Sequence, residues 1–271
     1  MELCVFSKHL QESDYQNLGK ALKSIGIEGV DLTVRKGGHV EPAEVKEKLP
    51  IAKEALLREG VKITMITTEI TDINQLYAKD VLGAASNLGI GYFKLGYYAY
   101  QEFGSLRKLL REANAKLKDI AKFCEEKKIK AGYHNHSGNC LGASLPHLID
   151  LLENCSPEWV GAYYDIGHAA IEGGYSGWKM NLDYISNRLF MVAVKDLSFA
   201  RIKDVDPSSK WPWKTQVVPL GEGLVNWKEF SDFLKTLNFN GPLSMHSEYQ
   251  LPVEQVVEQT KKDLTFLRKI L

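Results

Sequence analysis

The segment LCVFSKHL (residues 3–10) separates two fold classes that this chain of 271 residues could adopt. Its first half, Leu3–Phe6, is a short apolar run, which is typical of a buried parallel strand. An open dinucleotide-binding sheet would carry the glycine pattern G-x-G-x-x-G directly after this strand. The second half, Ser7–Leu10, contains no glycine. The segment therefore favours a closed barrel over an open doubly wound sheet.

Similar strand-like runs recur along the whole chain and alternate with amphipathic helical patterns. The further runs are Gly29–Leu32, Lys62–Ile66, Tyr92–Leu95, Lys130–Tyr133, Val160–Tyr164, Phe190–Val194 and Pro242–Met245. The clearest helical patterns are Tyr15–Ile25, Val45–Glu59, Phe103–Lys128 and Val253–Ile270. Eight such units without a linker-like tract predict one domain over residues 1–271, a single (β/α)8 TIM barrel.

Residues typical of helix ends lie at the boundaries of the predicted helices. Gly26, Gly60 and Gly89 each follow a helical pattern, where a residue with positive φ commonly ends a helix. Asp72 and Ser144 are predicted to cap the starts of two further helices.

The connection over residues 197–226 is far longer than the two to six residues that are usual after a barrel strand. It follows the seventh strand, so it lies on the C-terminal face of the barrel. It carries Trp211 and Trp213, which predicts a lid or a wall on which a substrate stacks. The alternative is a surface loop that packs on its own aromatic side chains.

Composition excludes several classes of protein. Lys plus Arg equals Asp plus Glu at 34 each, and the chain lacks the basic excess expected of a nucleic-acid-binding protein. No apolar run is long enough for a transmembrane helix. The first residues indicate a strand rather than a signal peptide, which predicts a cytoplasmic location, although a removed leader stays open. The four cysteines show no CxxC spacing, so we expect free thiols rather than a zinc site.

Ionisable side chains follow most of the predicted strands, and barrel strand ends share one mouth. Those that we single out are Arg35, Lys94, His134, His136, Asp165, Lys195, His246 and Glu248. Charged groups avoid burial unless they are paired or functional. Imidazole and carboxylate ligands together suit Zn²⁺, Mn²⁺, Fe²⁺ or Co²⁺. The sequence therefore predicts a divalent-metal site in the mouth, with His134 and Asp165 among its ligands.

Each of these residues also has a structural alternative. His134 and His136 could bond to neighbouring carbonyls, although we expect His136 to bind substrate. Asp165 could instead cap the following helix. Lys195 is expected to contact substrate or act in catalysis, or else to pair with Asp165 or Asp196.

Three other strand ends complete this set of expectations. Arg35 could bind an anionic or polyhydroxyl group, or be solvated. Lys94, a substrate-binding candidate, could neutralise Glu69. His246 and Glu248 are predicted to share one face of the eighth strand, since they are two residues apart.

The order of the strand-end motifs resembles the xylose-isomerase-like barrel superfamily, which includes sugar phosphate isomerases, epimerases and inosose dehydratases. The resemblance covers the whole chain. Each motif is weak alone, but their order and placement after successive strands make the match specific. The motifs are Gly132-Tyr133-His134-Asn135-His136, Tyr164-Asp165-Ile166-Gly167-His168, Val194-Lys195-Asp196, Pro219-Leu220-Gly221-Glu222-Gly223 and Gly241-Pro242-Leu243-Ser244-Met245-His246.

The resemblance implies a metal site that has diverged from the family pattern. Family members typically hold one metal with Glu, Asp, His and Glu after strands five to eight. Asp165 matches the family aspartate, whereas His134 and His246 replace the two glutamates and Ala193 replaces the histidine. Glu248 is a candidate substitute for the eighth-strand glutamate, and His168 matches a position that often contacts substrate. The implied ligands are His134, Asp165 and His246, a three-ligand set typical of catalytic zinc.

The first functional hypothesis is a sugar or cyclitol isomerase or epimerase that abstracts a proton beside a carbonyl, assisted by Zn, Mn, Co or Mg. Lys195, Glu248 and His168 would be its catalytic residues. Its partner would be a small sugar, with no nucleic acid or membrane, and exposed aromatic side chains would permit a homo-oligomer. The alternatives are a related sugar lyase or dehydratase and a metal-free carbohydrate-binding or scaffold barrel, which Ala193 favours. A nuclease is disfavoured by the neutral charge.

Overall fold

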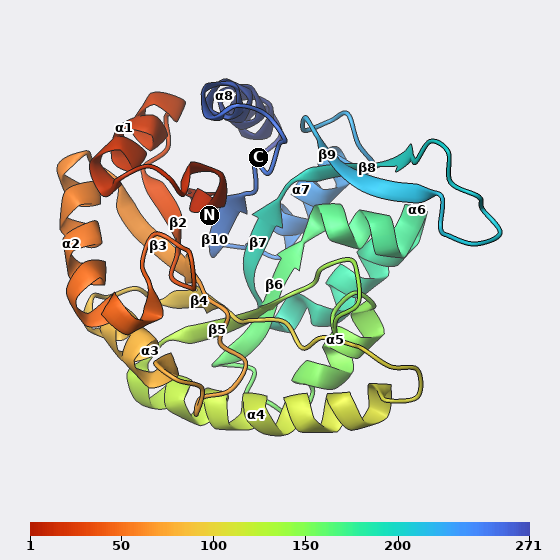
Figure 1. The fold of residues 1–271 in the computed structure, drawn as a ribbon, viewed down its shortest axis with the longest axis horizontal. Helices are drawn as coiled ribbons and strands as arrows, with labels where there is room; N and C mark the ends of the chain where they lie inside the picture. The colour runs from red at the N-terminus through yellow and green to blue at the C-terminus, as the bar shows by residue number, and fades with distance from the viewer.

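A closed barrel of eight parallel strands forms the centre of the protein (Figure 1), as seen in a computed structural model that describes residues 1–271. The barrel strands are β1 (Glu2–Phe6), β2 (Gly29–Thr33), β3 (Lys62–Thr67), β4 (Tyr92–Lys94), β5 (Lys130–His134), β6 (Val160–Asp165), β7 (Leu189–Val194) and β10 (Pro242–Met245). Strand β10 pairs with both β7 and β1, and β1 also pairs with β2, which closes the sheet. The predicted single (β/α)8 barrel is confirmed, strand by strand.

Helices surround this barrel as an outer ring (Figure 1). They are α1 (Tyr15–Ile25), α2 (Val45–Arg58), α3 (Ala78–Asn87), α4 (Leu106–Lys127), α5 (Leu145–Leu152), α6 (Ile166–Ile185), α7 (Trp227–Thr236) and α8 (Val253–Ile270). Short 3₁₀ turns are η1 (Ser7–Leu10), η2 (Pro42–Glu44) and η3 (Ser186–Arg188). None of the helices has both the length and the apolar character of a membrane span.

The residues predicted to end or begin helices do so in part. Gly26, Gly60 and Gly89 all have positive φ, at 92°, 77° and 73°. Ser144 is the N-cap residue of α5, as predicted, although its side chain makes no capping hydrogen bond. The predicted cap at Asp72 is wrong, because Asp72 accepts from the Asn74 amide well before α3 begins. Each residue type fits its place, but the local chain direction decides whether the side chain reaches a free amide.

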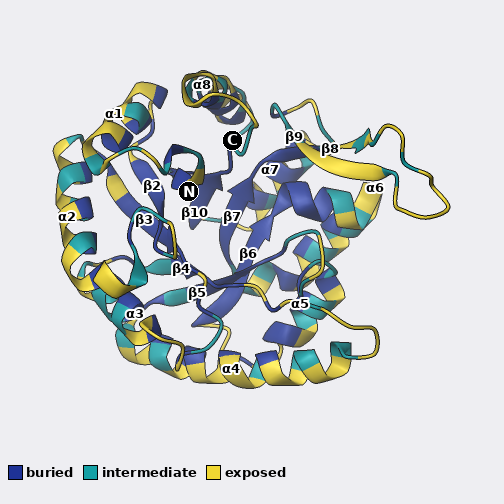
Figure 2. Cartoon of the chain, in the orientation of Figure 1, coloured by how far each residue is buried: buried dark blue, intermediate teal, exposed yellow.

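Two apolar layers hold the barrel together, and burial concentrates on its strands and on the helix faces that contact them (Figure 2). A second cluster of six buried residues includes Cys4 on β1, Met65 on β3 and Tyr163 on β6. Because β3 and β6 are not neighbours in the sheet, contact between them runs through the barrel interior. The interior is therefore a packed core that supports the mouth above it.

The long connection after β7 is not the plain loop that we expected. It contains an antiparallel hairpin of β8 (Asp196–Arg201) and β9 (Trp213–Val218), which extends outward from the barrel (Figure 1).

Asp196 anchors the base of this hairpin. Its carboxylate accepts hydrogen bonds from the amides of Gly221, Gly223 and Val225 and from the Trp227 indole. A Cβ at Gly223 would lie 2.1 Å from Asp196 Oδ1, so only glycine allows this approach.

Candidate functional site

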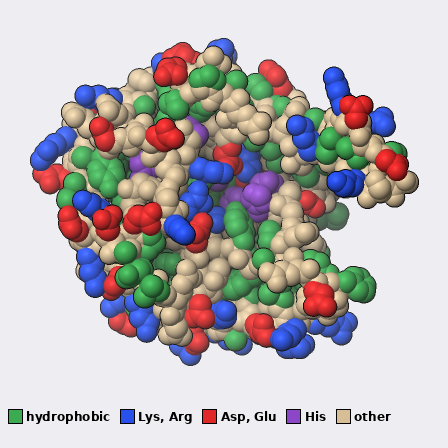
Figure 3. Space-filling model, viewed as in Figure 1, with side chains coloured by type: hydrophobic (Ala, Val, Ile, Leu, Met, Phe, Trp, Pro, Cys, Tyr) green, Lys and Arg blue, Asp and Glu red, His purple; other side chains and the backbone are tan.

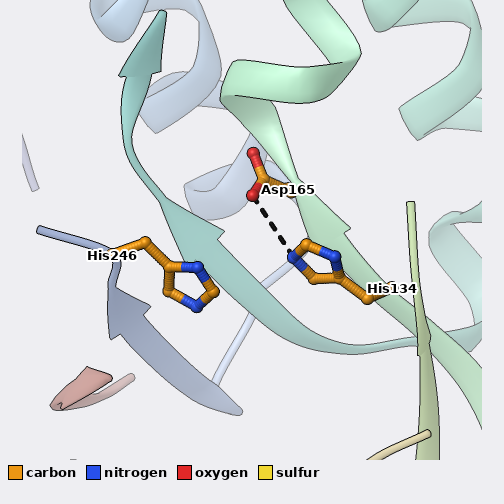
Figure 4. Close-up of side chains that lie close together, drawn as sticks. All are labelled: His134, Asp165 and His246. Atoms are coloured by element: carbon orange, nitrogen blue, oxygen red, sulfur yellow. Dashed lines mark ion pairs between the residues drawn. The ribbon is translucent and has the colours of Figure 1, made fainter. Parts of the chain in front are cut away.

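Three buried side chains from three different strands converge in the barrel mouth. His134 ends β5, Asp165 ends β6, and His246 directly follows β10. One potential ligand atom from each lies within 4.8 Å of the others. Figure 4 shows the imidazole of His246 facing the ion pair of His134 and Asp165. The structure thus brings together the three residues that the sequence indicated as metal ligands.

Two tyrosine hydroxyls orient the two imidazoles. Tyr97 Oη lies 2.8 Å from His134 Nδ1, and Tyr163 Oη lies 2.8 Å from His246 Nε2. The opposite nitrogens, His134 Nε2 and His246 Nδ1, are therefore the ones left for a ligand. Outer hydrogen bonds of this kind fix the tautomer and ring orientation of histidine ligands.

A chain of ion pairs runs from Asp165 to the edge of the mouth. Lys195 Nζ lies 3.0 Å from Asp165 Oδ2 and 3.2 Å from Glu248 Oε2. The other oxygen of Glu248 lies 2.7 Å from Lys8 Nζ. Asp165 and Lys195 are fully shielded from solvent, whereas Glu248 is partly exposed. Two carboxylates and two ammonium groups thus alternate from the barrel interior outward.

The protonation states at this centre follow from burial and from these pairs. Burial alone would raise the pKa of Asp165, but Lys195, His168 and His134 hold it well below its usual value. Burial alone would lower the pKa of Lys195, and the two carboxylates raise it. Burial lowers the pKa of His134 well below its usual value, although Asp165 opposes this shift. At neutral pH the centre therefore holds an ionised aspartate, an ammonium group and a neutral imidazole.

The donor atoms at this centre fit a divalent cation. His134 Nε2, Asp165 Oδ2 and His168 Nε2 are buried and make no hydrogen bond of good geometry, although they lie within ion-pair distance of other groups. Buried polar atoms are almost always hydrogen-bonded, so a group of unpartnered ones needs an explanation. Two imidazole nitrogens and one carboxylate oxygen form a set that binds Zn²⁺, Mn²⁺ or Co²⁺.

The strand register shows why the set has three members. Ala193 on β7 pairs with Asp165 on one side and with Ser244 on the other. It is therefore level with Asp165, and its buried side chain belongs to the cluster inside the barrel. The methyl group of Ala193 offers no ligand. A cation here would keep an open coordination position.

Two other histidines lie beside the centre. His168, in the first turn of α6, places Nε2 4.0 Å from Asp165 Oδ2, and the rings of His136 and His168 lie 3.9 Å apart. The Asp165 carboxylate also caps α6 by accepting a hydrogen bond from the His168 amide. Asp165 therefore caps the helix, which was the alternative that the sequence left open, and also pairs with Lys195, while its role as a metal ligand stays a prediction.

Other predicted contacts differ in detail. The ammonium group of Lys94 donates to the carbonyl of Leu95 and lies 3.9 Å from the centre of the Tyr97 ring, so it does not neutralise Glu69. Burial lowers the pKa of Lys94 to about 7. His246 and Glu248 lie beyond the end of β10 rather than on one strand face, yet both reach the mouth, with Nδ1 and Oε2 3.8 Å apart.

The tryptophans of the hairpin do not line this site. Trp211 and Trp213 are 72% and 41% exposed and lie at the outer end of the hairpin. Other hairpin residues do approach the site: Lys214 and Gln216 line a cavity of about 460 Å³ that Glu248 also lines. The hairpin thus forms a wall near Glu248, but through Lys214 and Gln216 rather than through Trp211 and Trp213.

Two residues of this site, Tyr163 and Lys8, were not among the predicted ones. Tyr163 lies two residues before Asp165, so strand alternation places both side chains on the same side of β6. That spacing could have revealed it. Lys8 lies in the connection after β1, where no regular spacing indicates the direction of a side chain.

Comparisons with known proteins agree with this architecture. The family model described as xylose isomerase-like TIM barrel matches residues 19–270. A search of the curated proteins found no relative of this sequence. Many solved structures match the fold.

Three of these structures illustrate the range. The apo 3-keto-D-glucoside 4-epimerase YcjR from E. coli has a TM-score of 0.74 and 12% identity, covering 99% of each chain. The IolI protein with a bound zinc atom has a TM-score of 0.76 and 14% identity, covering 100% of this chain and 99% of that one. The probable 3-DHS dehydratase AsbF from Bacillus anthracis has a TM-score of 0.70 and 16% identity, covering 98% and 99%.

Proposed function

The chain belongs to the xylose isomerase-like TIM-barrel family, and from that premise we propose that it is an isomerase or epimerase of a sugar or cyclitol. The proposed reaction is proton abstraction from the carbon next to a carbonyl. The observation that carries the proposal is the convergence of His134, Asp165 and His246 in the mouth, beside the Lys195–Glu248 ion pair. Epimerases among proteins of the same fold support the reaction class.

His134, Asp165 and His246 are the residues that would hold a divalent metal. Such a cation supplies positive charge that polarises a carbonyl oxygen and stabilises the negative charge that develops on it. The two nitrogen ligands suit Zn, Mn or Co better than Mg, which prefers oxygen ligands. Zinc bound to the IolI protein supports a metal in this fold. The identity of the metal stays a prediction.

Glu248 and Lys195 are the proposed proton-transfer pair. Burial would raise the pKa of Glu248, but Lys195, His246 and Lys8 hold it well below its usual value, so the carboxylate is ionised. It also lines a cavity, where it can meet a substrate C–H bond. Lys195 can stabilise the oxyanion left when that proton moves to Glu248. A base and a charge stabiliser within one ion pair are what this reaction requires.

Substrate hydroxyls would meet a ring of polar groups around this pair. His168 is the third proposed catalytic residue, because its unpartnered Nε2 can exchange a proton with a hydroxyl. His136 and Lys94 are proposed to bind the sugar from the β5 and β4 sides, and Arg35 from the β2 side. Figure 3 shows a group of histidine side chains in a hollow near the centre of this face, and further histidines to its upper left. Trp211 and Trp213 would reach a substrate only if the hairpin moved.

Two alternative functions are each supported by one specific observation. A sugar lyase or dehydratase would start with the same proton abstraction and then expel a neighbouring hydroxyl, and the probable dehydratase of the same fold supports it. A metal-free carbohydrate-binding or scaffold barrel is favoured by Ala193 at the ligand position. A cytoplasmic location and a homo-oligomer stay predictions.

Metal analysis combined with turnover tests the proposal. We expect the purified protein to bind about one equivalent of divalent metal and to convert at least one member of a keto-sugar and keto-cyclitol panel. His246→Phe keeps the ring that stacks on Phe6 but removes the ligand nitrogen, so metal binding should be lost. The matched control, His147→Phe on α5, should bind metal normally. Metal-free protein that converts no member of the panel would refute the proposal.

A further inference from the structure

Asp31 is a buried carboxylate inside the barrel that the proposed mechanism does not use. It lies on β2, and its side chain is fully shielded from solvent. Its Oδ1 accepts a hydrogen bond from Thr67 Oγ1 at 2.7 Å. Its Oδ2 accepts from Ser244 Oγ at 3.0 Å and from Tyr163 Oη at 3.3 Å. These three hydroxyl groups come from β3, β10 and β6, so the carboxylate links four strands of the barrel.

Tyr163 connects Asp31 to one of the proposed metal ligands. Its hydroxyl oxygen lies 3.3 Å from Asp31 Oδ2 and 2.8 Å from His246 Nε2. All three side chains are buried, so bulk water does not compete for these hydrogen bonds. Phe6 stacks on the His246 ring with 4.6 Å between the ring centres, which limits rotation of the imidazole. Asp31 is thus linked to His246 through a single hydroxyl group.

The one hydrogen of the Tyr163 hydroxyl decides which nitrogen of His246 carries a hydrogen. Burial raises the pKa of Asp31, but His246 and the three hydroxyl groups oppose this shift, because they stabilise the ionised form. An ionised carboxylate can only accept hydrogen bonds, so the Tyr163 hydrogen points to Asp31. If it pointed to His246 instead, two oxygens without a hydrogen between them would face each other in the core, which costs free energy. The Tyr163 oxygen is therefore an acceptor, and His246 Nε2 has to donate to it.

His134 is held in a different way. Tyr97 Oη lies 2.8 Å from His134 Nδ1, but no carboxylate accepts a hydrogen bond from Tyr97. The carboxylate at His134 is Asp165, which lies 3.2 Å from Nε2 and contacts the ring directly. A change at Asp31 is therefore expected to act on His246 and to leave His134 as it is.

We propose that Asp31 is a positioning residue for His246, which rests on the function proposed above because His246 is a metal ligand there. Acting through Tyr163, Asp31 keeps the hydrogen of His246 on Nε2 and leaves Nδ1 with a free lone pair. Nδ1 is the nitrogen nearer to the proposed proton-transfer pair, 3.8 Å from Glu248 Oε2. A neutral imidazole binds a metal through the nitrogen that carries no hydrogen, so this tautomer is the one that can bind at the centre. Strand β2 thereby contributes to a centre whose direct ligands come from β5, β6 and the end of β10.

Nitrogen-15 NMR of the metal-free protein at pH 8 measures the tautomer of each histidine without any turnover, and His246→Phe identifies the His246 signals. We expect the Nε2–H tautomer of His246 in the wild type. In Asp31→Asn the Nδ1–H tautomer should become populated, because a neutral amide no longer requires the Tyr163 hydrogen. Thr67→Val removes another hydroxyl from the same carboxylate and should leave the tautomer unchanged. The His134 signals should be the same in the wild type and in both of these variants.

Zinc affinity, measured by competition with a chelator, gives a second readout. Asp31→Asn and Tyr163→Phe should each weaken zinc binding by about 10-fold, the effect typical of losing an outer partner of a metal-bound histidine. Because Asp31 acts through Tyr163, the double variant should lose no more than either single variant. Thr67→Val should bind zinc as the wild type does.

Three results would overturn the role of Asp31. They are the Nδ1–H tautomer of His246 in the wild type, the same tautomer in the wild type and in Asp31→Asn, and zinc losses of the single variants that add up in the double variant. Additive losses would mean that the Asp31 charge acts on the metal without Tyr163. Wild-type protein that binds no zinc would count against the proposed function, whereas the tautomer measurement would still decide the role of Asp31, since it uses the metal-free protein.

Discussion

Asp165→Asn is expected to lower kcat/KM for the sugar substrate by about 10²- to 10³-fold while the protein stays folded. The substitution removes the only carboxylate ligand among the proposed three and the charge that holds Lys195 at 3.0 Å. Folding should survive, because asparagine also caps helices well and Asp165 accepts the His168 amide at the start of α6. Steady-state kinetics on the substrate identified from the panel measures the loss.

Metal affinity provides the matching control for that variant. It should fall by about 10-fold or more in Asp165→Asn, because a neutral amide is a poorer ligand than a carboxylate. Asp119→Asn, at an exposed position on α4, should change neither kcat/KM nor metal affinity. If Asp165→Asn retained both full activity and full metal affinity, the centre would not be catalytic. The carbohydrate-binding or scaffold barrel would then be the better account.

Lys195→Met is expected to destabilise the protein by about 3 to 5 kcal/mol in the free energy of unfolding. Lys195 is buried and lies between Asp165 and Glu248, so its loss leaves Asp165 buried beside neutral imidazoles only. Urea unfolding at pH 7 measures the change. Lys8→Met is the matched control, since Lys8 pairs with the same Glu248 but is half exposed, and it should cost no more than about 1 kcal/mol.

The difference in the free energy of unfolding between the wild type and Lys195→Met should depend on pH, and this dependence identifies its cause. In the wild type the pKa of Asp165 is depressed, so its ionised form contributes stability above the unfolded pKa, about 3.9. Without Lys195, less positive charge opposes the effect of burial, so the pKa of Asp165 should rise. Protonation of Asp165 then removes the unpaired buried charge of the variant as the pH falls. The difference in the free energy of unfolding between the two proteins should therefore narrow from pH 7 towards pH 4. A constant gap would indicate lost packing of the lysine stem rather than a lost ion pair.

Much of the fold could be predicted from the sequence because strand and helix patterns are local. The run Leu3–Phe6 and its later equivalents carry their own periodicity, and parallel strands must close in order. The same logic placed His134, Asp165 and His246 together, since residues at strand ends share one mouth.

The rest of the site depends on the path of the loops, which no periodic sequence pattern indicates. The hairpin shows this clearly: Trp213–Val218 is a strand, but its partner lies across a turn of irregular sequence. The long loop with two tryptophans therefore suggested a lid or a stacking wall, whereas the hairpin carries Trp211 and Trp213 outward. Lys195 could have paired with Asp165 or Asp196, and only the folded chain shows Asp196 occupied by backbone amides. The position of Lys8 beside Glu248 depends in the same way on loop conformation.

Deuterium exchange reports directly on whether the mouth of this barrel abstracts a proton beside a sugar carbonyl. The wild-type protein is incubated in D₂O with a keto-sugar that it converts, and proton NMR follows the carbon next to the carbonyl. We expect one deuterium to enter at that carbon with turnover, and Asp165→Asn to slow this entry in step with activity. Product that keeps its original hydrogen at that carbon through repeated interconversion would contradict this expectation.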